Sequence, residues 1–206
     1  MYTAALTVAW VIGIFYATIP TFWLMVHPLA ERWRLRGGAY RTLVPLWALI
    51  IGALGALTWP WRTLTFYRTP WSWAPAAALI VTALFIYRRS FTGFFRNQLV
   101  GRPELEPDRK QQLVTSGIHG RVRHPIYLAG LCVLLGLTLG SGLVVLCVLA
   151  PYALITGAFM IRQEERELER RFGEAYRLYK RFVPAAILPR LPVVFYSARA
   201  RTKGKL

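Results

Sequence analysis

Five long stretches without a single Asp, Glu, Lys or Arg constrain the fold of this 206-residue chain more than any other feature. They are residues 4–26, 43–61, 71–87, 125–139 and 142–161. A helix needs about 20 apolar residues to cross the hydrocarbon core of a membrane. The first, second and fifth stretches reach that length, and the third is marginal. The fourth is short and suits one arm of a tight hairpin around residues 140–142. We therefore expect an all-α integral membrane protein with about five transmembrane helices.

The charged residues indicate how these helices are oriented. The formal net charge is +17, with 26 Lys and Arg against nine Asp and Glu. In a soluble protein this excess would suggest a nucleic-acid partner. Here 24 of the 26 basic residues fall in segments 27–42, 88–124 and 162–206, which five spans place on one side of the membrane. By the positive-inside rule that side is cytoplasmic and the N-terminus lies outside. We expect membrane lipids as the surroundings and no nucleic-acid partner.

The chain reads as one membrane domain over residues 1–206. Three spans occupy residues 1–87, and a cytoplasmic loop occupies residues 88–124. A helical hairpin follows over 125–161, and an amphipathic helix with a basic tail completes the chain over 162–206. The N-terminal stretch is expected to be a retained span, because no Lys or Arg precedes it and it is longer than the core of a signal peptide.

The predicted C-terminal helix covers residues 162–182. Its apolar side chains recur at helical spacing from Leu168 to Tyr179, and charged residues occupy its other faces. Pro184 is expected to stop it. Such basic amphipathic helices commonly lie in the membrane interface.

A first polar cluster stands directly before the fourth apolar stretch. His124 precedes Pro125, which suits the first position of a helix, while the residue before a proline is disfavoured in the α region. His124 is therefore predicted to cap this helix, with Tyr127 in its first turn. The free backbone N–H groups there can bind a carboxylate or phosphate, and Arg121 and Arg123 add positive charge. The alternative is that both arginines only anchor the span at the lipid headgroups.

A second polar cluster, Glu164 and Glu165, stands where the fifth stretch ends. One hairpin separates the two clusters, so they can meet at the same membrane surface. A carboxylate there can hold a cationic group, or it can simply pair with neighbouring arginines. A helix start that binds anions, facing a carboxylate, suits both ends of an amino acid. This combination predicts a site for the methionine part of S-adenosylmethionine.

Four sequence elements occur in a fixed order in this half of the chain. They are Leu-Val-Thr-Ser-Gly at 113–117, Arg-His-Pro-Ile-Tyr at 123–127, Glu164-Glu165, and Phe-Gly-Glu-Ala-Tyr-Arg-Leu-Tyr at 172–179. With them, the segment from Gln111 to about Pro184 resembles the isoprenylcysteine carboxyl methyltransferase family of integral membrane enzymes. The related phospholipid methyltransferases share much of this pattern. The first three spans carry no such match.

The resemblance implies a cytoplasmic pocket for S-adenosylmethionine and a hydrophobic or lipid-borne substrate that arrives from the bilayer. Carried over to this chain, the resemblance places Leu113 and Val114 along the adenosine of the cofactor, with Gln111 nearby. His119 takes the place of an aromatic residue that borders the cofactor. The methionine portion would be held by His124, Pro125 and Tyr127, and its ammonium group by Glu164. Glu165 is expected on the substrate side.

One departure concerns the methyl acceptor. Eukaryotic members of the family place a substrate-orienting arginine about four residues before the glutamate, where this chain has Met160. Arg162 is the nearest candidate for that catalytic and substrate-binding role. The acceptor therefore stays open among a prenylcysteine-like carboxylate, a phospholipid amine, a small thiol and another lipid. The oligomeric state is not readable from the sequence.

Two other functions compete with a methyltransferase. One is a membrane reductase of the sterol reductase type, which would bind NADPH with these arginines. The other is a small membrane scaffold or transport component whose arginines serve only topology. No metal is expected, because Cys132 and Cys147 lie inside predicted spans and no ligand spacing is present.

Overall fold

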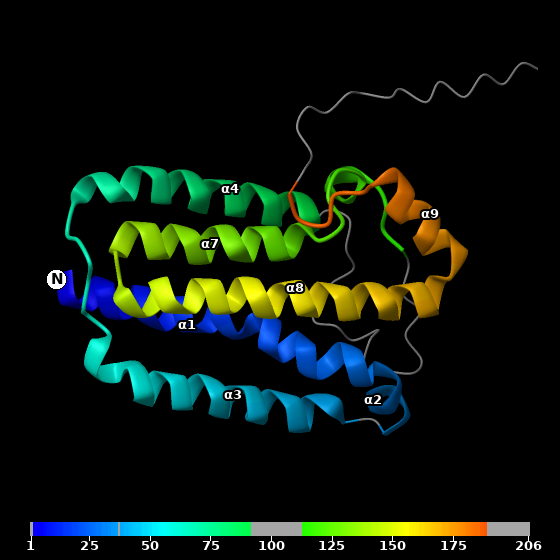
Figure 1. The fold of residues 1–206 in the computed structure, drawn as a ribbon, viewed down its shortest axis with the longest axis horizontal. Helices are drawn as coiled ribbons and strands as arrows, with labels where there is room; N and C mark the ends of the chain where they lie inside the picture. Colours follow the sequence, from blue (N-terminus) through cyan, green and yellow to red (C-terminus); the bar gives the residue numbers. More distant parts are fainter. Residues whose placement is uncertain (1, 37, 92–112, 189–206) are drawn as a thin grey trace, which may run out of the picture.

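The computed structural model describes residues 2–36, 38–91 and 113–188, and these contain helices and no strand (Figure 1). The helices are α1 Tyr2–Val26, η1 His27–Leu29, α2 Ala30–Arg36, α3 Ala39–Thr58, η2 Trp59–Trp61, η3 Pro70–Ser72, α4 Trp73–Phe91, η4 Gly117–Gly120, α7 Pro125–Ser141, α8 Val144–Phe172 and α9 Glu174–Phe182. The predicted all-α class is confirmed.

Four helical segments of the described chain are long and apolar enough to cross a membrane. They are Tyr2–Arg36, Ala39–Trp61, Pro70–Phe91 and Val144–Phe172. The helix Pro125–Ser141 is apolar but shorter, as the length of the fourth stretch predicts. The helical content and these apolar helices make the chain a multi-pass membrane protein.

The long helices lie side by side in the order α4, α7, α8, α1 and α3 across the view of Figure 1. The packed pairs include α4 with α7, α1 with α8 and α1 with α3. The main core lies between α1, α7 and α8, where Leu6, Ile14, Leu134 and Leu146 are almost fully buried. At the α3 contact, the indole of Trp47 points toward α1 and donates a hydrogen bond to the Thr18 hydroxyl over 3.1 Å.

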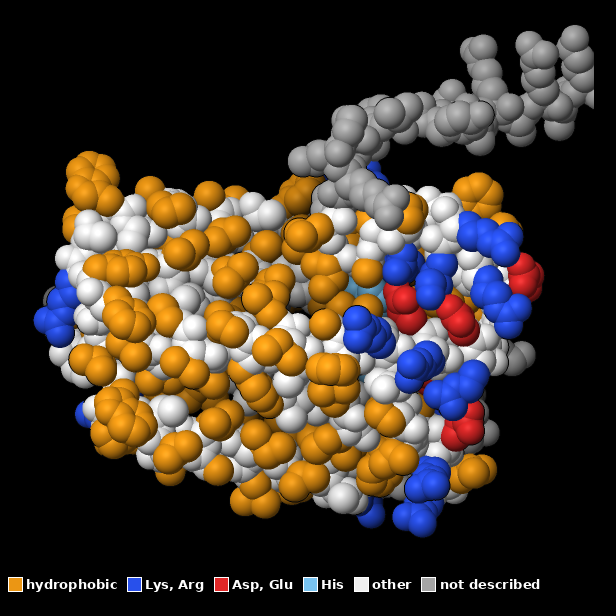
Figure 2. All heavy atoms as spheres, viewed as in Figure 1, with side chains coloured by type: hydrophobic (Ala, Val, Ile, Leu, Met, Phe, Trp, Pro, Cys, Tyr) orange, Lys and Arg blue, Asp and Glu red, His pale blue; other side chains and the backbone are white. Residues whose placement is uncertain are grey.

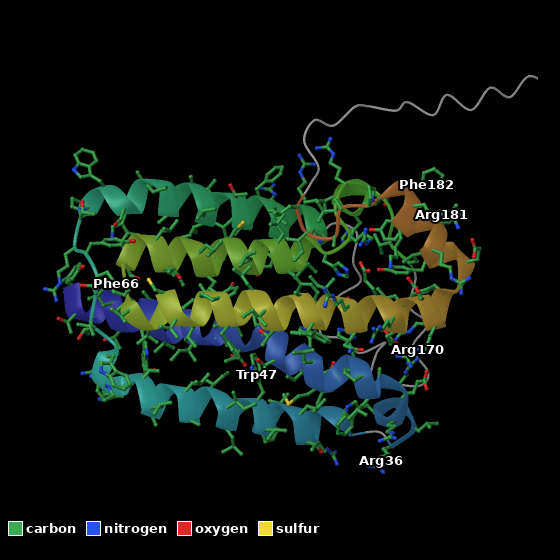
Figure 3. All side chains as sticks on the ribbon, in the orientation of Figure 1. Arg36, Trp47, Phe66, Arg170, Arg181 and Phe182 are labelled. Atoms are coloured by element: carbon green, nitrogen blue, oxygen red, sulfur yellow. The ribbon has the colours of Figure 1, made fainter. Side chains whose placement is uncertain are left out.

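Charged side chains gather at one end of the molecule, which we call the polar end. Figure 2 shows hydrophobic side chains over most of the visible face, while Lys, Arg, Asp and Glu concentrate beside α9 and α2. Arg36, Arg170 and Arg181 all lie at this end, and Phe66 lies at the opposite end (Figure 3). Exposed hydrophobic residues on the long helices, such as Leu49 and Val81, suit contact with lipid.

One predicted helix has different bounds in the structure. The expectation of a separate helix over 162–182 is wrong, because α8 runs without a break to Phe172 and so carries the fifth span into the polar end. Its Arg, Gln and Glu residues are good helix formers, so nothing interrupts the helix at the membrane boundary. Gly173, with φ 56° and ψ −126°, ends α8. The C-terminal amphipathic helix is therefore the shorter α9, and residues 189–206 of the predicted tail lie outside the described residues.

The α7–α8 hairpin is held at the end opposite the polar end. Gly142 takes a left-handed conformation with φ 63°, and its N–H donates to the Thr138 carbonyl over 3.0 Å. Next to it, an added Cβ at Gly140 would meet the Trp73 ring at 2.6 Å and the Ala76 Cβ at 3.0 Å. This close approach lets α7 pack against α4.

We predict that Gly140→Ala destabilises the protein by about 1–3 kcal/mol, because a rigid indole must shift. The matched control is Gly52→Ala on α3, where an added Cβ meets nothing within 4 Å and better helix propensity gives a change of up to about 1 kcal/mol in the stabilising direction. Thermal unfolding in detergent measures both variants. Equal transition temperatures for the two would contradict the packing described here.

Candidate active site

A cavity of about 420 Å³ opens into the polar half of the helix bundle. Its wall combines residues of α1, η1, α4, α7, α8 and α9 with the segments that precede α7 and follow α9. The described residues that the sequence predicts to bind the cofactor all line it: Leu113, Val114, His119, His124, Pro125, Tyr127 and Glu164. Gln111 lies outside the described residues. Residues from positions 113 to 164 thus share one wall, although the hairpin separates them in sequence.

The segment before α7 is fixed by the residues that follow α9. The backbone N–H groups of Arg123 and His124 donate to the carbonyls of Ala185 and Ala186 over 3.0 and 2.9 Å. The Tyr179 hydroxyl donates to the His119 carbonyl over 2.8 Å. These bonds hold His119 and His124 at the cavity although they lie outside the long helices.

His124 is the N-cap of α7, with φ −120° and ψ 62°, and Pro125 is the first helical residue. The imidazole is buried between two carboxylates, with Nδ1 3.3 Å from Glu164 Oε2 and Nε2 3.3 Å from Glu165 Oε1. Burial alone lowers the pKa of His124, but the two carboxylates outweigh burial and raise it to about 9. His124 is therefore an imidazolium at neutral pH.

His119 has the opposite character. Burial lowers the pKa of His119 to about 4, and the charge of His124 contributes in the same direction. A neutral imidazole thus borders the cavity where the resemblance places an aromatic residue.

Glu165 belongs to an ion-pair cluster rather than to the cavity wall. Arg123 donates to Glu165 Oε1 from Nε over 2.9 Å and from its terminal nitrogen over 2.6 Å. Lys180 of α9 lies 3.1 Å from Glu165 Oε2. We call Arg123, His124, Glu165 and Lys180 the Glu165 cluster. It joins α7, α8 and α9, so the geometry favours a structural role, and the substrate-binding role of Glu165 stays a prediction.

Arg162 points away from the cavity. It is exposed on α8, and its guanidinium lies 5.9 Å from the centre of the Phe159 ring. It is not among the residues that line the cavity, whereas the buried Met160 is. The catalytic and substrate-binding role of Arg162 stays a prediction that the geometry does not favour.

Sequence reasoning did not predict several polar residues of the wall, and His27 and Tyr176 are two of them. His27 is 2% exposed and Tyr176 is 1% exposed. Neither the ring nitrogens of His27 nor the Tyr176 hydroxyl has a hydrogen-bond partner among the described residues. An unsatisfied buried group costs about 1–3 kcal/mol, so both indicate polar ligand atoms. The sequence does contain a signal for His27. Like His124, it is followed by a proline at the edge of an apolar stretch: His27-Pro28 follows the first stretch, and His124-Pro125 stands at the start of the fourth.

Within the described residues, no group of three or more His, Cys, Asp or Glu side chains could hold a metal ion. Two ionisable groups of the cavity wall, His124 and Glu164, pair with each other.

Comparison with family models shows which family the chain belongs to. The family model for phospholipid methyltransferases matches residues 71–175, which is more than half of the chain, and the chain belongs to this family. The match runs from η3 through α4, α7 and α8 to the start of α9, and it leaves α1, η1 and α3 outside. The comparisons with curated proteins and with solved structures found no match. The fold and the family together define a multi-pass membrane methyltransferase.

The raised pKa of His124 predicts how stability depends on pH. The folded protein binds the His124 proton more tightly than the unfolded chain does. This difference stabilises the folded state fully below the ordinary histidine pKa of 6.5, and the stabilisation is lost as pH rises through the folded-state pKa of about 9. The difference in melting temperature between the wild type and His124→Gln should shrink as pH rises between 7 and 10.

Thermal unfolding of the ligand-free protein in detergent measures this difference, and titrating groups that do not interact with His124 cancel between the two variants. His119→Gln is the control, because a group with a pKa of about 4 contributes no slope between pH 7 and 10. A His124 difference that did not change with pH would contradict an imidazolium at this position.

Proposed function

We propose that the protein transfers the methyl group of S-adenosylmethionine to a lipid-borne acceptor. The observation that carries this proposal is the cavity in which the start of α7 and the Glu164 carboxylate share one wall. That wall offers complementary partners for the two ends of an amino acid. The family description, which names phospholipids, supports the same chemistry.

The residues present fit the cofactor. Pro125 has no N–H and the Leu128 N–H donates to the His124 carbonyl over 3.2 Å, so the N–H groups at the start of α7 that suit a carboxylate belong to Ile126 and Tyr127. The His124 imidazolium adds positive charge beside them. Glu164 Oε2 is buried and lies 3.3 Å from His124 Nδ1, but this ion pair does not have the geometry of a hydrogen bond. The Glu164 carboxylate can therefore accept hydrogen bonds from an ammonium group in addition to this ion pair. Leu113, Val114 and His119 provide a less polar wall for the adenosine.

S-adenosylmethionine supplies an already activated methyl group. The work of this chain is therefore to bind and orient the two reactants and to exclude water. Tyr176 and Tyr179 close the cavity from α9, where their rings pack with Leu113, Leu168 and Phe172. In this proposal the methyl group passes directly from S-adenosylmethionine to the acceptor, so no charged residue of the described wall forms a bond with it.

The acceptor reaches the cavity from the bilayer in this proposal. The deeper part of the wall is apolar, with Ile19, Leu131 and Leu154 between α1, α7 and α8, and it suits a lipid chain. The distribution of basic residues supports a cytoplasmic location for the polar end. A phospholipid amine is the first acceptor to test, and a prenylcysteine-like carboxylate is the second because of the resemblance in residues 111–184.

We predict that Glu164→Gln weakens S-adenosylmethionine binding roughly ten- to a hundredfold. A charge-assisted hydrogen bond of about 1.5–3 kcal/mol is lost. The matched control is Glu174→Gln on α9, since Glu174 is exposed and pairs only with Arg177 within the described residues, over 3.2 Å. Calorimetry on purified protein in the presence of a chelator measures both affinities.

A wild-type protein that bound NADPH and not S-adenosylmethionine would instead favour the reductase. Loss of binding in chelator, restored by a divalent ion, would contradict a site built from these residues alone.

A further inference from the structure

His27 is the feature of the cavity that the proposed cofactor leaves unexplained. It lies on η1, directly after α1, and therefore outside the region that the family model matches. Its ring stacks on Trp23, with ring centres 5.3 Å apart and planes 20° apart, and both residues line the cavity. The indole of Trp23 covers one face of the imidazole. Neither ring nitrogen of His27 makes a hydrogen bond with the described residues.

The turn that carries His27 is held in place. Pro28 follows it, the Ala30 N–H donates to the His27 carbonyl, and the indole of Trp33 donates to the Met25 carbonyl over 3.1 Å. The turn also packs against α8. The imidazole is thus fixed in the wall by its backbone rather than by a polar partner of its ring.

The charged groups that act on His27 come from two elements. Glu164, Glu167 and Arg171 belong to α8, and His124 caps α7. Glu167 is already engaged by Arg171 and by Arg34 of α2, the latter over 3.0 Å. Glu164 and His124 face each other. Burial and apolar stacking favour the neutral form of an imidazole, which leaves His27 as a base without a hydrogen-bond partner among the described residues.

Methyl acceptors differ in whether they need a base. A carboxylate attacks the sulfonium methyl group in the form that it has at neutral pH. An alkylammonium, with a pKa near that of lysine, about 10.4, carries no free electron pair until it loses a proton. A carboxylate acceptor would instead need a cationic partner. The guanidinium of Arg123, in the described wall, already donates hydrogen bonds to Glu165 and to the Val183 carbonyl. The wall therefore offers a base for an amine and no uncommitted Arg or Lys for a carboxylate within the part of the chain that is described.

We infer that His27 accepts the proton of a lipid-borne ammonium acceptor before methyl transfer. The inference rests on the proposed function. The acceptor N–H bond breaks and its proton goes to a ring nitrogen of His27. The free amine then forms the N–CH₃ bond as the S–CH₃ bond breaks, and sulfur keeps the electron pair as a neutral thioether. The imidazolium afterwards releases its proton to water.

The test uses the full-length protein in mixed micelles of detergent and phosphatidylethanolamine, with methyl-labelled S-adenosylmethionine. His27→Gln should lower kcat at pH 7 by about a hundredfold or more, which is the usual contribution of a general base. It should leave the affinity for S-adenosylmethionine unchanged. The loss should shrink as pH rises toward 10, where the acceptor amine deprotonates in solution. Leu29→Ala, in the same turn and outside the cavity wall, should match the wild type.

Chemical rescue separates a base from a packing residue. His27→Ala leaves room in the wall, so added imidazole should restore turnover at pH 7. Pyrazole, a ring of the same size and much lower basicity, should not. Equal rescue by both rings would show that His27 only fills space, and would overturn the inference.

The remaining outcomes distinguish this inference from the proposed function. If the wild type neither bound S-adenosylmethionine nor methylated any acceptor, the proposed function would fail and the inference with it. If the wild type methylated phosphatidylethanolamine and His27→Gln did so equally well at pH 7, only the inference would fail. Loss of cofactor affinity in His27→Gln would make His27 a cofactor ligand and would also overturn it.

Discussion

The Glu165 cluster is the interaction on which the rest of the polar end depends. Removing charges from water is costly, and they persist beside hydrocarbon only when they are paired. Glu165 meets this condition with Arg123 from the segment before α7 and Lys180 from α9. Arg123 in turn donates to the Val183 carbonyl over 2.6 Å. One carboxylate on α8 therefore fixes the start of α7 and the position of α9 together.

The cavity follows from that arrangement. Because α8 continues past the span and Gly173 turns the chain, α9 can fold back over the segment that contains His119 and His124. The wall then combines a protonated imidazole, a buried carboxylate and apolar side chains within one enclosed space. A zwitterionic cofactor end and a lipid chain require these two environments side by side.

Local sequence patterns predicted most of this structure. Uncharged runs located the long helices, and the His124-Pro125 pair located the start of α7. The predicted helix over 162–182 has the wrong bounds because the end of the apolar stretch was taken as the end of a helix. The thickness of the lipid sets where an apolar stretch ends, whereas backbone conformation and helix propensity set where a helix ends. The wall position of His27 and the partnership of Glu165 with Lys180 depend on which helices pack together, and no local period encodes that choice. The same limit applies to Arg162, whose direction on α8 the motif did not determine.

Photocrosslinking with methyl-labelled S-adenosylmethionine, followed by peptide mapping, tests the central claim most directly. The claim is that the wall formed by the start of α7 and the end of α8 holds the cofactor. It predicts label in peptides from residues 113–127 or 160–179, and loss of that label with excess S-adenosylhomocysteine. The helix α3 contributes no residue to the cavity wall. If the label that S-adenosylhomocysteine removes were found only in α3, this result would contradict the claim.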